Sequence, residues 1–141
     1  MRRGFTLFEL LLAIALMALI FAMALPFGLE FYRRNTLDAE RENLAAVLRQ
    51  ARGRAMANIR ETPHGVRIAP EGYTVFEGDS YAARDPAYDT LFPKDAAIVA
   101  SGLAEVVFSE LQGNANASGT VSLESGGGRA ELHINYEGRI D

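Results

Sequence analysis

The chain changes its hydrophobic pattern twice. Residues 5–25 are almost continuously apolar and carry one charge, Glu9. Between Leu37 and Ile59, apolar residues recur at spacings of three, four and seven, which predicts an amphipathic helix. After Pro63, apolar and polar residues alternate in short runs, which is typical of half-buried strands. The sequence therefore predicts a helical N-terminal part and a β-rich C-terminal part.

The first apolar segment has the length of a membrane span. Its 21 residues, from position 5 to 25, form about 30 Å of helix, which matches the hydrocarbon core of a bilayer. Arg2 and Arg3 precede the segment and favour a cytoplasmic N-terminus, although Arg33 and Arg34 follow it. Two alternatives remain open. One is a secretory signal peptide that is cleaved after Ala24, and the other is a helix buried in a soluble domain.

The two helical patterns join into one long helix from residue 5 to about residue 59. Pro26 lies at the outer end of the apolar half, where a proline tends to kink a helix. Pro63 ends the pattern, because the residue before a proline is pushed out of helical geometry. We divide this part into residues 5–29, the transmembrane and assembly half, and residues 30–62, the amphipathic half.

Residues 63–141 form a β-rich globular head. Turns at 70–72 and 125–128 each join two strands into a hairpin, and residues 78–95 read as a long polar loop. The predicted strands are 66–69, 73–77, 97–100, 106–108, 120–124 and 130–136. The fold class is therefore α+β, with a long N-terminal helix, membrane-spanning in its first half, packed against a small antiparallel sheet.

The first nine residues, Met-Arg-Arg-Gly-Phe-Thr-Leu-Phe-Glu, carry the most specific motif of the chain. A short basic leader that ends in glycine, followed by an apolar helix with an early glutamate, resembles type IV prepilins and the pseudopilins of type II secretion. The resemblance implies a leader of residues 1–4 and a prepilin peptidase that cleaves between Gly4 and Phe5 and methylates the new N-terminal Phe5. Prolines at the position of Pro26 are common in such families, which implies a role in assembly.

The head resembles the GspH/FimT branch of pseudopilins and minor pilins in three places. These are residues 48–55, with Ala-Arg-x-x-Ala character, Phe108 followed by Gly113 and the strand 120–123, and the closing segment 132–140. The resemblance implies a pilin-like fold and a structural subunit without enzymatic activity or cofactor. It implies a minor pseudopilin or minor pilin, held in the inner membrane with its head outside the cytoplasm and then built into a pseudopilus or pilus.

The partners that this resemblance implies are the prepilin peptidase, other pilin or pseudopilin subunits, and an inner-membrane assembly platform with its ATPase. Glu9 is the candidate assembly residue, because a carboxylate in or near lipid is costly unless it is paired. After cleavage it can neutralise the α-amine of Phe5 on the neighbouring subunit. The alternative is that Glu9 pairs with its own Phe5 amine or with lipid headgroups at the membrane edge.

Composition limits the functions that the chain can have. The formal net charge is −4, and loss of the two leader arginines leaves 12 basic against 18 acidic residues, which argues against a general nucleic-acid binder. DNA uptake through Arg129 and Arg139 remains an alternative, since some FimT-like pilins use C-terminal arginines. A soluble β domain released after Ala24 is the other. There is no cysteine, so disulfides and cysteine-based metal sites are excluded.

No enzyme site emerges from the sequence. The two histidines, His64 and His133, lie on different predicted elements, and the glycine-rich turn at 126–128 precedes no helix that would cradle a phosphate. The four aspartates of the long loop, Asp79, Asp85, Asp89 and Asp95, have an oxygen-rich composition that suits Ca²⁺. Their spacing does not match an EF-hand, and a solvated acidic loop is the preferred interpretation.

Overall fold

A computed structural model describes residues 6–141 of the chain, and for residues 24–34 it describes the backbone only. One long helix, α1, runs from Leu7 to Met56. The chain divides into two compact units, residues 1–34 and residues 35–141, so that α1 contributes to both. We call the second the C-terminal unit. In the part of the chain whose side chains the structure describes, no helix has both the length and the apolar character that a membrane span requires.

The helix ends three residues earlier than its hydrophobic pattern predicts. A short 3-10 turn, η1 (Ile59–Glu61), follows α1, and Asn58, Arg60 and Glu61 all have left-handed backbone angles, with φ of 51°, 59° and 52°. Left-handed residues cannot continue a right-handed helix. The chain therefore reverses direction here, before Pro63, and enters the first strand.

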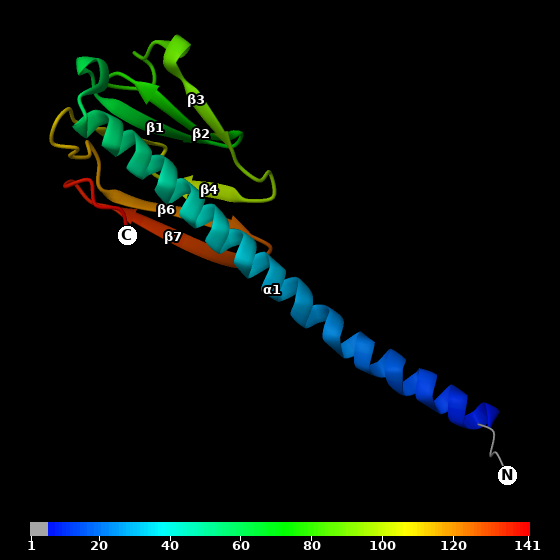
Figure 1. The fold of residues 1–141 in the computed structure, drawn as a ribbon. Coiled ribbons are helices and arrows are strands. Elements are labelled where there is room, and N and C mark those ends of the chain that lie inside the picture. The colour runs from blue at the N-terminus through cyan, green and yellow to red at the C-terminus, as the bar shows by residue number, and fades with distance from the viewer. Residues whose placement is uncertain (1–5) are drawn as a thin grey trace. The chain divides into compact units, whose positions relative to one another are not determined.

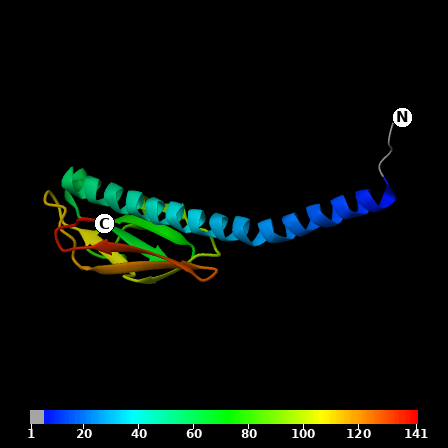
Figure 2. The same cartoon turned by 90° about the horizontal axis from the view of Figure 1, so that it is seen from below.

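A four-stranded antiparallel sheet follows, with strand order β3-β2-β1-β5. The predicted hairpin at 66–77 is confirmed, because β1 pairs with β2 across the turn at residues 70–71. The strands are β1 (His64–Ala69), β2 (Gly72–Glu77), β3 (Thr90–Pro93) and β5 (Glu105–Phe108). Figures 1 and 2 show these strands in the layer that lies against the second half of α1.

The prediction that all of residues 78–95 form a long polar loop is wrong. This segment contains a 3-10 turn, η2 (Pro86–Tyr88), and the edge strand β3. Leu91 pairs with Thr74 and Phe92 with Tyr73, so the β-forming run Thr-Leu-Phe extends the sheet. Pro93 ends the strand at an edge position, where a missing backbone donor is tolerated.

The remaining strands form a second sheet, where the sequence predicted only one. Its order is β4-β6-β7, with β4 (Val99–Gly102), β6 (Gly119–Ser125) and β7 (Gly128–Ile134). The predicted hairpin of the last two strands is confirmed, and its two central residues, Gly126 and Gly127, have φ of 55° and 86°. Such angles suit glycine and give the tight turn. β4 starts two residues later than predicted, and β7 ends at Ile134 rather than Tyr136.

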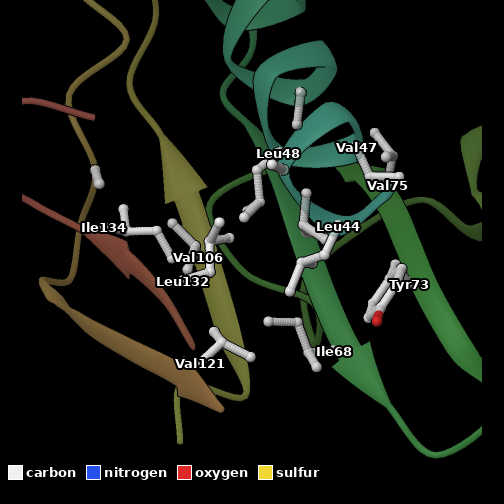
Figure 3. Close-up of a cluster of buried hydrophobic side chains, with 14 of the residues drawn as sticks. Leu44, Val47, Leu48, Ile68, Tyr73, Val75, Val106, Val121, Leu132 and Ile134 are labelled. Atoms are coloured by element: carbon white, nitrogen blue, oxygen red, sulfur yellow. The ribbon is translucent and has the colours of Figure 1, made fainter. Parts of the chain in front are cut away.

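One hydrophobic core joins both sheets to α1. The helix contributes the predicted apolar stripe up to Ala55, whereas Ile59 lies beyond the helix and is 42% exposed. Figure 3 shows the helical leucines pointing toward side chains of both sheets. The core includes Leu44, Val47, Leu48, Val66, Ile68, Tyr73, Val75, Val106, Val121, Leu132 and Ile134. The amphipathic half of the helix therefore holds the two sheets together.

The opposite face of the four-stranded sheet is covered by the segment before β3. Phe76 is fully buried against Gly65, where any β-carbon would lie 2.3 Å from the Phe76 ring. The Tyr81 ring meets Phe76 edge-on at 5.6 Å, and the Arg84 guanidinium lies 3.5 Å from the Tyr81 ring centre. Arg84 also pairs with Asp89 at 2.8 Å. Residues 78–89 thus form a fixed cover.

Candidate assembly site

The start of α1 is built around Thr6 and Glu9. The Thr6 hydroxyl accepts a hydrogen bond from the Glu9 backbone N–H at 3.3 Å, and the Thr6 carbonyl accepts one from Leu10 N–H at 3.1 Å. A threonine cap with glutamate three residues later has the spacing of a capping box. The Glu9 carboxylate also lies in the first turn, where the positive end of the helix dipole favours an anion. The helix dipole therefore favours an acidic side chain at position 9 even without a binding partner.

The described first half of α1 exposes apolar side chains on all sides. Their exposed fractions range from 52% at Leu12 to 78% at Leu7. The set is Leu7, Phe8, Leu10, Leu11, Leu12, Ile14, Leu16, Met17, Leu19, Ile20, Phe21 and Met23. A continuous apolar surface of this kind marks a site that contacts other apolar groups. Glu9 is the one ionisable side chain within it.

The other predicted residues of this site are outside the described part of the structure. Gly4 and Phe5, the residues of the predicted cleavage and methylation, precede residue 6. The backbone of α1 is helical through Pro26, but its side chain lies outside the described residues. Glu9 is therefore the predicted assembly residue whose surroundings the structure describes.

The two arginines of the DNA-binding alternative lie apart. Arg129 is the second residue of β7, and its guanidinium is 2.8 Å from the Glu131 carboxylate and 3.8 Å from that of Glu124. Arg139 follows the end of the strand and pairs with Asp141 at 2.9 Å. Its backbone N–H binds the Asn135 side chain, six residues beyond Arg129, which is roughly 20 Å along an extended chain. The structure does not bring these two residues together.

Three of the four aspartates predicted as a possible cation cluster, Asp85, Asp89 and Asp95, have local partners. Asp89 pairs with Arg84, the Asp85 carboxylate accepts from Ala87 N–H at 3.0 Å, and Asp95 accepts from Ala97 N–H at 2.9 Å. Among the side chains described at residues 6–23 and 35–141, no group of three acidic, histidine or cysteine residues is placed to hold a metal ion. These carboxylates therefore act as caps and ion-pair partners in their own segment.

The histidines lie on different sheets. His64 is fully buried on β1, with Nδ1 3.0 Å from the Thr62 carbonyl oxygen and Nε2 3.6 Å from the Glu77 carboxylate. His133 is exposed on β7, where its Nδ1 lies 3.3 Å from the Thr120 hydroxyl. Each imidazole contacts groups of its own sheet or of the adjoining turn.

The structure also reveals a junction that the sequence did not predict. The Arg52 guanidinium, on α1, donates from Nε to the Gly113 carbonyl at 3.0 Å and from Nη2 to the Glu137 carbonyl at 3.1 Å. A β-carbon on Gly138 would lie 2.1 Å from the Gly113 oxygen. The three segments that resemble the GspH/FimT branch, 48–55, 108–123 and 132–140, thus meet at Arg52. The sequence signal for this junction was that these three segments occur in this order along the chain.

Comparison with known proteins bears on the N-terminal segment. The family described as "Prokaryotic N-terminal methylation motif" matches residues 1–25. The segment is of the prepilin type. This match supports a pilin-type subunit that a prepilin peptidase processes and that assembles with other pilin subunits. No curated protein and no solved structure matches the chain.

Proposed function

We propose that this protein is a minor pseudopilin or minor pilin, a structural subunit of a type II secretion pseudopilus or a type IV pilus. The observation that carries the proposal is the methylation motif at residues 1–25, which leads directly into the exposed apolar half of α1. A motif for processing and a surface for apolar contact thus occupy the same segment. The resemblance of the head to the GspH/FimT branch supports the minor rather than the major class.

In this proposal the chain begins as a membrane-held precursor. Residues 5–29 anchor it in the inner membrane, with the head outside the cytoplasm, until the peptidase cleaves between Gly4 and Phe5 and methylates Phe5. The processed subunit then leaves the bilayer through the assembly platform. Its apolar surface on α1 exchanges lipid for the helices of other subunits, so the hydrophobic contact is retained at each stage.

Glu9 provides the register for this step. A free α-amine on Phe5 and a carboxylate on Glu9 are both costly in an apolar bundle, and pairing across neighbouring subunits relieves both costs. Glu9 lies one helical turn from the new N-terminus, and the Thr6 cap on its backbone N–H fixes the start of the helix that carries it. Such a pair forms in one axial position, which excludes slipped arrangements of an otherwise featureless apolar surface.

The DNA-uptake alternative receives less support. Arg129 and Arg139 each lie against a carboxylate, and Arg129 is near the start of β7 whereas Arg139 lies beyond its end. Two partly neutralised cations contact few phosphates, so any binding is weak and strongly salt-dependent. A gel-shift assay of the protein at low salt tests this alternative, and a retained band that Arg129→Ala and Arg139→Ala abolish would favour it.

The test of the main proposal is intact mass and N-terminal sequencing of the protein from cells with and without a prepilin peptidase. We expect a chain that starts at Phe5 and is heavier by one methyl group, and only in cells that have the peptidase. A chain that starts at Leu25 in both strains would instead indicate a secreted soluble domain. That result would contradict the proposal and the role of Glu9 with it.

A further inference from the structure

Four strands lie at the edges of the two sheets, and three of these edges are covered or interrupted. Beside β5, the Asn116 N–H donates to the Val107 carbonyl oxygen at 2.9 Å. Beside β7, His133 and Asp141 exchange two backbone hydrogen bonds, at 2.9 and 3.0 Å. The edge strand β3 carries Pro93, which has no backbone N–H to offer. Proteins block edge strands in such ways because an open edge pairs with other chains.

The fourth edge strand, β4, has none of these features. It pairs with β6 on one side, and within the backbone described at residues 6–141 nothing pairs with its other side. Its sequence, Val-Ala-Ser-Gly, contains no charge and no proline, and Val99 is 63% exposed. Alternate residues of an antiparallel edge strand direct their N–H and C=O groups away from the partner strand. β4 therefore presents a short row of free backbone donors and acceptors.

A pocket of about 170 Å³ opens beside this strand. Among the described residues, none of β6 lines the pocket, so it lies on the side of β4 that has no partner strand. An apolar cavity of about 150 Å³ is large enough for benzene, so this pocket has room for one aliphatic or aromatic side chain. The lining comes from the end of β1, the turn after it and residues 94–100, and includes Ile68, Pro70, Lys94, Ala96, Ile98 and Ala100.

Lys94 gives this apolar pocket a positive charge. Its ammonium group donates to the backbone carbonyl of Asp95, at 3.2 Å, and to that of Ile98. Among the side chains described at 6–23 and 35–141, no carboxylate pairs with it. An ammonium group has three donors, so one remains for an anion. A ligand that places a carboxylate next to an apolar side chain therefore complements the pocket in shape and in charge.

We propose that β4 is a docking strand for an extended segment of another protein. The segment pairs with the free backbone groups of β4 and adds a fourth strand to the second sheet. One of its apolar side chains enters the pocket, and an acidic residue two positions away, on the same face of the extended segment, pairs with Lys94. All the residues of this site belong to the C-terminal unit, so the proposal does not depend on the N-terminal motif.

The test uses the full chain in detergent and a synthetic peptide of this chemistry. The peptide is fluorescent, capped at both ends and has the sequence Thr-Val-Thr-Leu-Thr-Asp, in which Leu and Asp share one face of an extended strand. A second peptide has the same side chains but N-methyl groups on its backbone amides, so it has no backbone donors. A third peptide ends in Asn instead of Asp. Fluorescence anisotropy measures the affinity of each peptide.

We expect the first peptide to bind and the N-methylated peptide to bind at least about tenfold more weakly, because the latter cannot donate to β4. Lys94→Gln should weaken binding of the acidic peptide about two- to fivefold and leave binding of the Asn peptide unchanged. The proposal fails if the first peptide does not bind, if the N-methylated peptide binds equally well, or if Lys94→Gln leaves the affinity for the acidic peptide unchanged.

Two alanine positions supply a matched pair of variants for the pocket. Ala96 is exposed and lines the pocket, and Ala83 is exposed in the cover formed by residues 78–89. Ala96→Phe places a ring in the pocket and should lower the affinity for the first peptide at least about fivefold. Ala83→Phe should leave the affinity unchanged. Circular dichroism checks that both variants fold, and equal affinities of the two folded variants would show that the pocket takes no part.

A second copy of the chain is the competing occupant of this edge. In that case two β4 strands would pair with each other, and the protein alone would form dimers that the first peptide does not dissociate. Sedimentation of the protein in detergent, with and without the peptide, detects such dimers, and their presence would overturn the assignment to another protein. None of these measurements depends on processing at Phe5, so their failure would leave the test of the proposed function unaffected.

Discussion

Arg52 and Gly113 are 61 positions apart in the chain, and the Arg52 Nε–H donates to the Gly113 carbonyl oxygen at 3.0 Å. The same guanidinium reaches the Glu137 carbonyl, so one side chain ties α1 to two separate connections of the β-rich head. Arginine suits this position because its planar fork presents several donors at fixed angles. A lysine has one nitrogen and cannot satisfy both carbonyls in the same geometry.

We therefore expect Arg52→Lys to lower the free energy of unfolding of residues 35–141 by about 1–3 kcal/mol, the cost of leaving a buried acceptor unpaired. Denaturant titration followed by circular dichroism measures this change. Arg54→Lys is the matched control, because Arg54 has no partner among the side chains described at 6–23 and 35–141, and it should change stability by less than about 0.5 kcal/mol. Equal effects of the two substitutions would contradict the role of Arg52.

Gly138 allows this junction to close. Its φ is 72°, and a β-carbon there would lie 2.1 Å from the Gly113 oxygen and 2.8 Å from Arg52 Nε. Gly127 also has a positive φ, 86°, but nothing lies within 4 Å of its β-carbon position. Gly127→Ala should therefore cost only the left-handed conformation, about 1–2 kcal/mol. Gly138→Ala should cost clearly more, by at least about 2 kcal/mol, because backbone atoms must also move. Thermal unfolding of the two variants side by side checks the difference.

Tyr73 gives the C-terminal unit a weakness at alkaline pH. Burial raises the pKa of the Tyr73 phenol far above its ordinary value, and the Glu40 carboxylate raises it further. The stabilisation is fully present below about pH 10, the ordinary pKa, and is lost as the pH rises above it, because the unfolded chain ionises first. We expect Tyr73→Phe to flatten the fall in stability between about pH 10 and 12. At pH 7 the substitution should change stability by less than about 1.5 kcal/mol. Denaturation midpoints over this pH range measure both effects, and parallel curves would contradict the assignment.

Glu9→Gln tests the register mechanism. The substitution removes the charge but keeps the length of the side chain, so the precursor should enter the membrane and be cleaved normally. Recovery in sheared filaments should fall at least about tenfold, the change expected when a charge pair in an apolar site is lost. Quantitative immunoblots of membrane and filament fractions separate the two steps. Normal recovery of the variant in filaments would refute intersubunit pairing.

The sequence predicted the elements with a strong local signal. The apolar stripe from Leu44 to Ala55 and the glycines at 126 and 127 fixed the helix and the last hairpin, because periodicity and turn chemistry act within a few residues. It did not predict β3, since Thr90-Leu91-Phe92 is a short run among turn residues that becomes a strand only when β2 offers a free edge. The division into two sheets depends on pairing between distant segments in the same way.

For the candidate site, the sequence predicted Glu9 as the one charge near the start of an apolar helix. The Thr6 cap on the Glu9 backbone N–H was not predicted. The sequence also did not predict the junction at Arg52. The partners of Arg52 are backbone carbonyl groups, which every residue has, so no side-chain pattern marks them. The early end of α1 was also missed, because left-handed conformations at Asn58, Arg60 and Glu61 have no strong signal in residues other than glycine.

The cover formed by residues 78–89 separates the exposed outer surface of the head from the side chains that stabilise the four-stranded sheet. Tyr81 packs on Phe76, Arg84 packs on Tyr81, and most residues between and around these two are exposed. Substitutions at Ala82, Ala83 or Asp79 would therefore alter the outer surface and leave the sheet beneath it unchanged. Related subunits that assemble together can in this way share one fold and still differ in the surfaces that contact their neighbours.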